Sequence, residues 1–165
     1  MHASTPPSPA AAGATADAPP RTLLGWRLLA LFYDLWPVLA LWMLVAIPFV
    51  LADVALHGGD SRHNIAPFSL MAWALWLSCW GVTGLYATLS WRRGGQTLGM
   101  RPWRLQLHAA DGTAPAWGAL WLRYAVGTLS LLAAGLGFWW AWLDPQRRTW
   151  HDRASGTSVS RLPKR

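Results

Sequence analysis

The chain has 165 residues, of which 53% are hydrophobic and 13% are charged, about half the charged share of an average soluble domain. Its net charge of +7 comes from 14 Lys and Arg against 7 Asp and Glu. Because the basic residues flank apolar blocks, we interpret them as contacts to lipid headgroups and expect no nucleic-acid partner. The single cysteine, Cys79, excludes an intrachain disulfide and a cysteine metal cluster.

The N-terminal half predicts a tail and two membrane spans. Residues 1–21 are rich in Pro and Ala without apolar periodicity, so we expect a disordered tail and no signal peptide. The block Leu28–Leu51 contains Asp34 as its single charge, and the block Pro67–Trp91 contains none. Since about 20 apolar residues cross a bilayer, both blocks predict transmembrane helices.

The polar loop 52–66 between these blocks carries acidic and histidine side chains in a spacing that vaguely resembles a metal site: Asp53, His57, Asp60 and His63. Nothing in the pattern fixes their geometry, so we expect no metal here.

A basic, glycine-rich segment follows the second block. We interpret Gly95, Thr97 and Gly99 as a tight interfacial turn that lets the backbone approach a neighbouring element. The alternating residues from Arg104 to Ala109, followed by the turn signal Asp111-Gly112, predict a short strand. Residues 156–160 favour another.

The third apolar block, Trp117–Leu143, allows two interpretations. The positive-inside rule puts the N-terminus and loop 92–116 in the cytoplasm. Three full spans would then send the C-terminal tail outside, although that tail is strongly basic. A block that bends near Gly127 or the Gly135/Gly137 pair and returns to the same side removes the conflict. Tryptophans at both ends of the block favour a continuous span instead. We favour the bent form.

Few charges lie within or beside the apolar blocks, and these are the candidate functional residues. A lone carboxylate such as Asp34 is costly in hydrocarbon unless it is paired, protonated or facing water. Arg27 lies about 10 Å away along the helix axis, so we expect Arg123, in the third block, to be a second partner. With Asp152 these residues form a candidate charged cluster. It either locks helix packing or serves function, and both interpretations stay open.

Three signatures in order resemble the RDD family of bacterial membrane proteins. They are Arg27-Leu-Leu-Ala30-Leu-Phe-Tyr-Asp34, then Gly95-Gln-Thr97-Leu-Gly99-Met, then Arg147-Arg148-Thr-Trp-His151-Asp152-Arg153-Ala154-Ser-Gly156-Thr157. The resemblance implies that Arg27, Asp34 and Asp152 are the name-giving residues. The sequence departs from the family pattern at Met100–Arg104, where Pro102 disfavours a continuous strand. A transport role, including cation/proton exchange, has been proposed for the family.

The sequence therefore predicts an all-α integral membrane protein with two or three transmembrane helices and a short interfacial β-like segment. We expect a membrane domain over residues 22–160 and a basic end over residues 161–165. The resemblance implies the bacterial cell (inner) membrane and a transporter or transport-associated component. The alternative is a non-catalytic scaffold or accessory subunit. We expect the lipid bilayer, a homo-oligomer or another membrane protein as partners. No nucleophile or paired-carboxylate pattern indicates an enzyme, and no cofactor is indicated.

Overall fold

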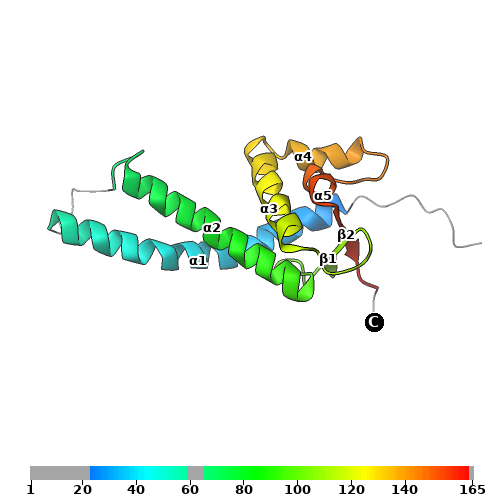
Figure 1. Ribbon diagram of the computed structural model, residues 1–165, viewed down its shortest axis with the longest axis horizontal. Helices are drawn as coiled ribbons and strands as arrows, with labels where there is room; N and C mark the ends of the chain where they lie inside the picture. Colours follow the sequence, from blue (N-terminus) through cyan, green and yellow to red (C-terminus); the bar gives the residue numbers. More distant parts are fainter. Residues whose placement is uncertain (1–22, 59–64, 164–165) are drawn as a thin grey trace, which may run out of the picture.

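The computed structural model describes residues 23–58 and 65–163, so the tail predicted over residues 1–21 lies outside the described residues. The chain is mostly helical, with one small sheet (Figure 1). In chain order the elements are α1 (Leu24–His57), α2 (Leu70–Gly94), β1 (Leu105–Ala109), α3 (Trp117–Leu132), α4 (Leu136–Trp139), the 3-10 helix η2 (Trp140–Trp142), α5 (Trp150–Ser155) and β2 (Thr157–Arg161).

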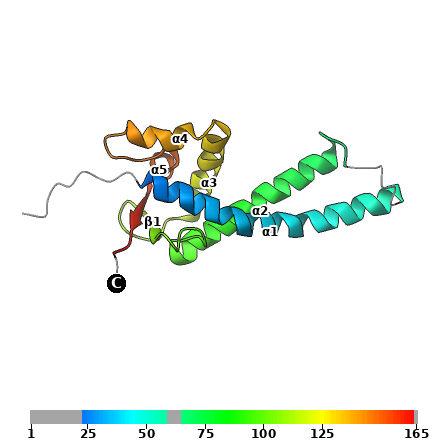
Figure 2. The same ribbon diagram turned by 180° about the vertical axis from the view of Figure 1, so that it is seen from behind.

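Helices α1 and α2 form a long antiparallel hairpin that extends away from the rest of the molecule (Figures 1 and 2). Both are long and apolar enough to cross a membrane, with mean hydropathies of 2.4 and 1.3 over their most apolar windows. None of that window in α1 is buried inside the molecule. Each helix ends at a glycine in the left-handed conformation, Gly58 and Gly95, as is common for helix C-termini.

The third apolar block is bent. Helix α3 and the α4–η2 segment meet at an angle of 107°. The chain turns at Ala134 and Gly135, whose φ angles of 53° and 76° are both left-handed and cannot continue a helix. The break predicted near Gly135/Gly137 is confirmed, whereas α3 runs through Gly127 unbroken. A straight helix over the whole block is therefore wrong, and the chain has two candidate spans, or three if the bent pair counts as one.

Strands β1 and β2 form a two-stranded antiparallel sheet, in which Leu105 lies opposite Arg161 and Ala109 opposite Thr157. Both short strands were predicted, and β1 begins after Pro102 as expected. The sheet lies beside the first turns of α1 and the end of α2 (Figure 2). A small core forms at this end of the molecule from Ala30, Met100, Leu105, Leu107 and Leu120. This core fixes the positions of the charged residues described next.

Candidate functional site

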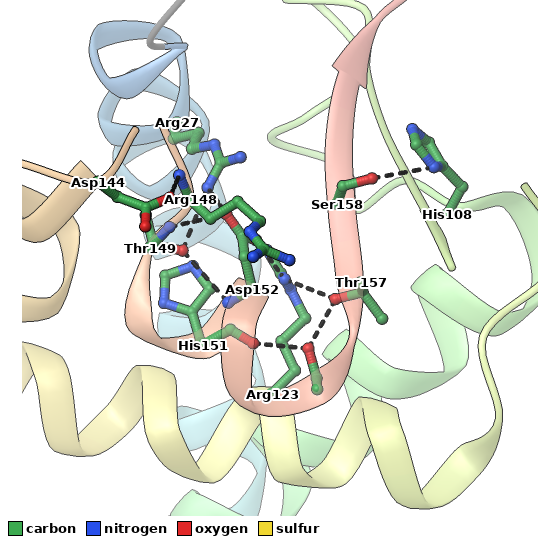
Figure 3. Close-up of polar contacts among 11 residues, drawn as sticks. Arg27, His108, Arg123, Asp144, Arg148, Thr149, His151, Asp152, Thr157 and Ser158 are labelled. Carbon is green, nitrogen blue, oxygen red and sulfur yellow. Dashed lines mark hydrogen bonds and ion pairs between the residues drawn. The ribbon is translucent and has the colours of Figure 1, made fainter. Parts of the chain in front are cut away.

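Asp152 joins two arginines from different helices in a buried cluster (Figure 3). The Nη1 atom of Arg27, in the first turn of α1, lies 2.5 Å from Oδ2 of Asp152. The Nη1 atom of Arg123, in α3, lies 2.6 Å from Oδ1. The exposed fractions of the three side chains are 12%, 6% and 1% for Arg27, Arg123 and Asp152. Each carboxylate oxygen thus accepts a charged hydrogen bond from a separate helix.

Helix α5 is six residues long, and a capping box sets its first turn. The Thr149 hydroxyl accepts a hydrogen bond from the Asp152 N–H (3.3 Å), and the Asp152 Oδ2 accepts one from the Thr149 N–H (3.1 Å). Arg123 also donates to the Thr157 hydroxyl at 2.8 Å, just beyond the helix. The same carboxylate therefore caps its own helix and binds the other two.

The electrostatic environment keeps Asp152 ionised and the neighbouring His151 neutral. Burial alone would raise the pKa of the Asp152 carboxyl, but the guanidinium groups of Arg123 and Arg27 hold that pKa well below its usual range. Burial and the Arg123 charge lower the pKa of His151 to about 3. At neutral pH two guanidinium charges thus face one carboxylate, and the cluster keeps a net positive charge.

Asp34 lies in a separate site, and its predicted partner is wrong. Its carboxylate accepts hydrogen bonds from the Tyr86 hydroxyl (2.7 Å), the Thr97 hydroxyl (2.5 Å) and the Gly99 N–H (2.8 Å). Arg123 is engaged by Asp152 instead. The four predicted charges therefore form one cluster of three residues and one carboxylate held by uncharged donors. Distance along α1 was readable from the sequence, but which helix face meets which neighbour was not.

The turn at residues 95–99 approaches α1 as closely as the sequence led us to expect. A Cβ atom on Gly99 would overlap the backbone oxygen of Ala30 and lie 2.7 Å from the Asp34 carboxyl carbon. Thr97 is 3% exposed. The missing side chain at Gly99 therefore lets its N–H reach the Asp34 carboxylate.

A cavity of about 800 Å³ opens beside both sites. Arg27, Arg123 and His151 line one part of it, and Asp34 lies further along α1. Most of the remaining lining is apolar or aromatic, contributed by α1, α2 and α3: Leu31, Val38, Trp42, Leu75, Trp76, Trp80, Tyr124, Gly127 and Leu131. Its size falls within the range of small-molecule sites, about 300–1,000 Å³.

Sequence reasoning missed three hydroxyl residues that complete these sites: Tyr86, Thr149 and Thr157. A signal existed for Thr149, because Thr-x-x-Asp is a capping-box pattern. Tyr86 is an uncharged polar residue in an apolar block and gave no comparable signal.

The segment predicted as loop 52–66 begins inside α1, because the helix continues to His57. Asp53 and His57 contact each other, with 3.2 Å between Oδ1 and Nδ1, whereas Asp60 and His63 lie outside the described residues. Within residues 23–58 and 65–163, no group of three or more His, Cys, Asp or Glu side chains is arranged to hold a metal ion.

Comparison with known proteins gives one finding on the whole domain. A family model, that of the RDD family, matches residues 21–156. The matched range contains Arg27, Asp34, the turn at residues 95–99, Arg123 and Asp152, so all the charged residues of both sites lie within it. The chain matches no curated protein and no solved structure.

Proposed function

This chain belongs to the RDD family, and from that premise we propose that it is a multi-pass protein of the bacterial cell membrane that acts in transport. Helices α1 and α2 cross the bilayer, which is supported by their length and apolar surface. The protein is non-catalytic in this proposal. Because two spans enclose little, a homo-oligomer or a partner membrane protein completes the pathway.

The sheet supports a specific topology. Strand β1 belongs to the loop after α2, and β2 belongs to the tail. Backbone hydrogen bonds between two strands cannot form across a bilayer, so the two segments lie on the same side. The bent α3–α4 segment then enters and leaves on that side. The positive-inside rule makes this side cytoplasmic, because loop 92–116 and the tail are both basic.

One observation carries the transport proposal: Asp34 lines the cavity, and every donor that reaches its carboxylate from the described residues is uncharged. A negative charge without a basic partner at membrane depth attracts a cation or a proton. Asp34 is therefore the residue that meets the transported ion in this proposal, and Tyr86 and Thr97 orient its two oxygens.

Cation-driven proton flux tests this proposal. The purified protein is reconstituted into proteoliposomes containing a pH-sensitive dye, and a Na⁺ or K⁺ gradient is applied. We expect Asp34→Asn to reduce flux to the level of empty liposomes, because the amide can neither ionise nor exchange a proton. Asp111→Asn, a change in the exposed turn after β1, is the matched control and keeps the wild-type rate. An Asp34→Asn protein that is folded and carries wild-type flux contradicts the proposal.

A scaffold or accessory subunit is the second candidate, and the Arg27–Asp152–Arg123 cluster favours it. Those charges are paired with one another and tie α1, α3 and α5 together, as a structural lock would. In that case neither Na⁺ nor K⁺ drives flux through the wild-type protein, and a second membrane protein co-purifies with it. Loss of that partner from Asp152→Asn, but not from Asp34→Asn, would distinguish the scaffold from the transporter.

A further inference from the structure

The cavity beside the charged cluster has unequal ends. At one end Arg27, Arg123 and His151 come from α1, α3 and α5. Toward the other end the lining is apolar, with Trp42 of α1, Trp76 of α2 and Leu131 of α3. The step from Arg27 to Trp42 along α1 is about 22 Å by helix rise. A cavity with a basic end and a long apolar lining suits an amphiphilic ligand with an anionic headgroup.

The basic end has hydrogen-bonding capacity that the protein does not use. The Nε atom of Arg27 and the Nδ1 atom of His151 are buried and have no partner among the described residues. His151 is 5% exposed, and a neutral imidazole can carry its one proton at Nδ1. A buried donor without a partner costs roughly 1–3 kcal/mol. An anion that accepts from both groups would remove that cost.

The charge of the cluster points to the same ligand. Asp152 neutralises one of its two arginines, so one positive charge is left over at this end. Asp34 lies about 10 Å further along α1, where three uncharged donors bind its carboxylate. The excess charge therefore lies at the Arg27 and Arg123 end of the cavity, away from its apolar lining.

The depth of Arg27 fits a lipid headgroup. Arg27 immediately precedes the apolar block of α1, so in a bilayer it lies where the hydrocarbon ends and the phosphates begin. From there the apolar lining descends for more than half of a hydrocarbon core about 30 Å thick. We propose that the cavity binds an anionic phospholipid of the cytoplasmic leaflet, with its phosphate on Arg27, Arg123 and His151 and one acyl chain along α1, α2 and α3.

This inference depends on the membrane placement proposed above but not on ion transport. A bound lipid would close the space between the helices and bridge α1 to α3 and α5. It would also lie against Asp34, since its acyl chain passes that residue. The lipid is thus a structural ligand of the cavity, and this proposal does not require ions to pass through it.

Native mass spectrometry of the detergent-solubilised full chain tests the site. Phosphatidylglycerol and phosphatidylcholine with identical acyl chains are titrated in turn. We expect one phosphatidylglycerol to remain bound per chain, at least about tenfold more tightly than phosphatidylcholine, as expected for one charge-assisted interaction. Inorganic phosphate should not displace it. Equal binding of the two lipids, or displacement by phosphate, overturns the proposal.

Two variants separate the headgroup site from the acyl-chain site. His151→Phe keeps the ring that packs on Phe138 but removes Nδ1, and should weaken phosphatidylglycerol binding. Gly127 lines the cavity and has nothing within 4 Å of an added Cβ, so Gly127→Leu should block the acyl chain and abolish binding. Gly118→Leu, in the same helix but outside the lining and equally unhindered, is the matched control.

Folding of each variant is checked by its melting temperature and by a monodisperse elution profile. Folded Gly127→Leu that binds phosphatidylglycerol as the wild type does would overturn the proposed acyl-chain path. Failure of the membrane placement has a separate readout, because a peripheral protein would be released from membranes by alkaline carbonate. Wild-type ion flux does not enter this experiment, so a negative transport result leaves the lipid result interpretable.

Discussion

At Asp152, two guanidinium groups from helices far apart in the chain share one carboxylate. Removing one partner from a buried ion pair is more damaging than the pair is stabilising, because the remaining charge stays buried without compensation. Here the loss would affect two arginines and the cap of α5 together. The stability of this end of the molecule is therefore concentrated in a single side chain.

We expect Asp152→Asn to lower the free energy of unfolding by about 3–5 kcal/mol, the range for breaking a buried ion pair. The amide keeps the size of the side chain but leaves both guanidinium charges uncompensated. Denaturation in mixed SDS micelles, followed by circular dichroism, measures the change. Asp111→Asn is the control, because Asp111 lies in an exposed turn, and its stability should stay close to that of the wild type. Equal stability of the two variants would show that the cluster is not a structural lock.

His151 gives the protein a pH dependence with a defined window. Its folded pKa of about 3 is below the value of about 6.5 expected in the unfolded chain. Its contribution to stability is therefore complete above pH 6.5 and is lost as the pH falls toward 3, at up to about 1.4 kcal/mol per pH unit. Asp152, whose pKa is also lowered, contributes its own loss only below about pH 4.

Comparison with His151→Phe isolates this effect from the other histidines. The stability difference between the variant and the wild type should be constant above about pH 7 and should shift increasingly in favour of the variant as the pH falls from 6.5 to 4. Thermal melting of both proteins in the same detergent over this range measures the difference. A constant difference across the range would mean that His151 is not buried in its neutral form. Arg27, Arg123 and Asp152 are the charged groups that face it.

The charged candidate residues could be predicted from the sequence, whereas the contacts they make could not, because those depend on the three-dimensional arrangement. Arg27, Asp34, Arg123 and Asp152 stand out because charges are rare in apolar blocks. The pairing of Asp34 was wrong because a carboxylate in a helix can be satisfied by neutral donors as well as by an arginine. Tyr86 supplies one of those donors from another helix, and nothing in its own sequence context indicates that role.

The turn at residues 95–99 acts at the scale of an element, because it positions the end of α2 against α1. Its N–H and hydroxyl donors hold Asp34 only while its backbone lies against Ala30. Gly99 is the residue that allows this distance. A side chain there would separate the two elements.

We expect Gly99→Ala to lower the free energy of unfolding by about 1–3 kcal/mol, the usual cost of overpacking. Gly94→Ala is a matched control at the end of α2, because a Cβ there meets nothing within 4 Å. The same denaturation assay compares them. If both variants are as stable as the wild type, the turn and α1 are further apart than described here.

Among the elements, the long helices were readable from the sequence and their assembly was not. Apolar blocks of bilayer length predict α1 and α2 directly, and the glycines at 135 and 137 indicated the break after α3. One strand was predicted from the alternating pattern of residues 104–109, and the other was predicted at residues 156–160. Their pairing was not, because two five-residue strands separated by α3, α4, η2 and α5 carry no signal of register. Helix α5 is too short for a periodic pattern.

At the scale of the whole molecule, the sheet and the charged cluster both support placing the same segments on one side of the membrane. The sheet joins the segment after α2 to the C-terminal tail. The cluster joins the start of α1 to the same tail. In the proposed topology the N-terminus, loop 92–116 and the tail share the cytoplasmic side, and only the turn between α1 and α2 faces outward. The bend of 107° makes this possible, because it brings the chain back from α3.

Cysteine accessibility in intact cells tests this topology. Cys79→Ser removes the native cysteine, and single cysteines are then placed at Ala66, Gly112 and Leu162. We expect a membrane-impermeant maleimide to label the residue-66 variant only, and to label the other two after the cells are opened. Labelling of the residue-162 variant from outside would mean that α3 and α4 together cross the bilayer.

The charged cluster also sets an order of events during synthesis. Arg27 and Asp152 are separated by 125 positions, so at about 5–20 residues per second the ribosome needs roughly 6–25 seconds to supply the carboxylate after the arginine. The strand partner of β1 emerges later still. In the proposed topology the first helix therefore enters the membrane before the counter-charge of Arg27 exists, and a chain cut short before α5 would leave Arg27 and Arg123 without the carboxylate that pairs with them.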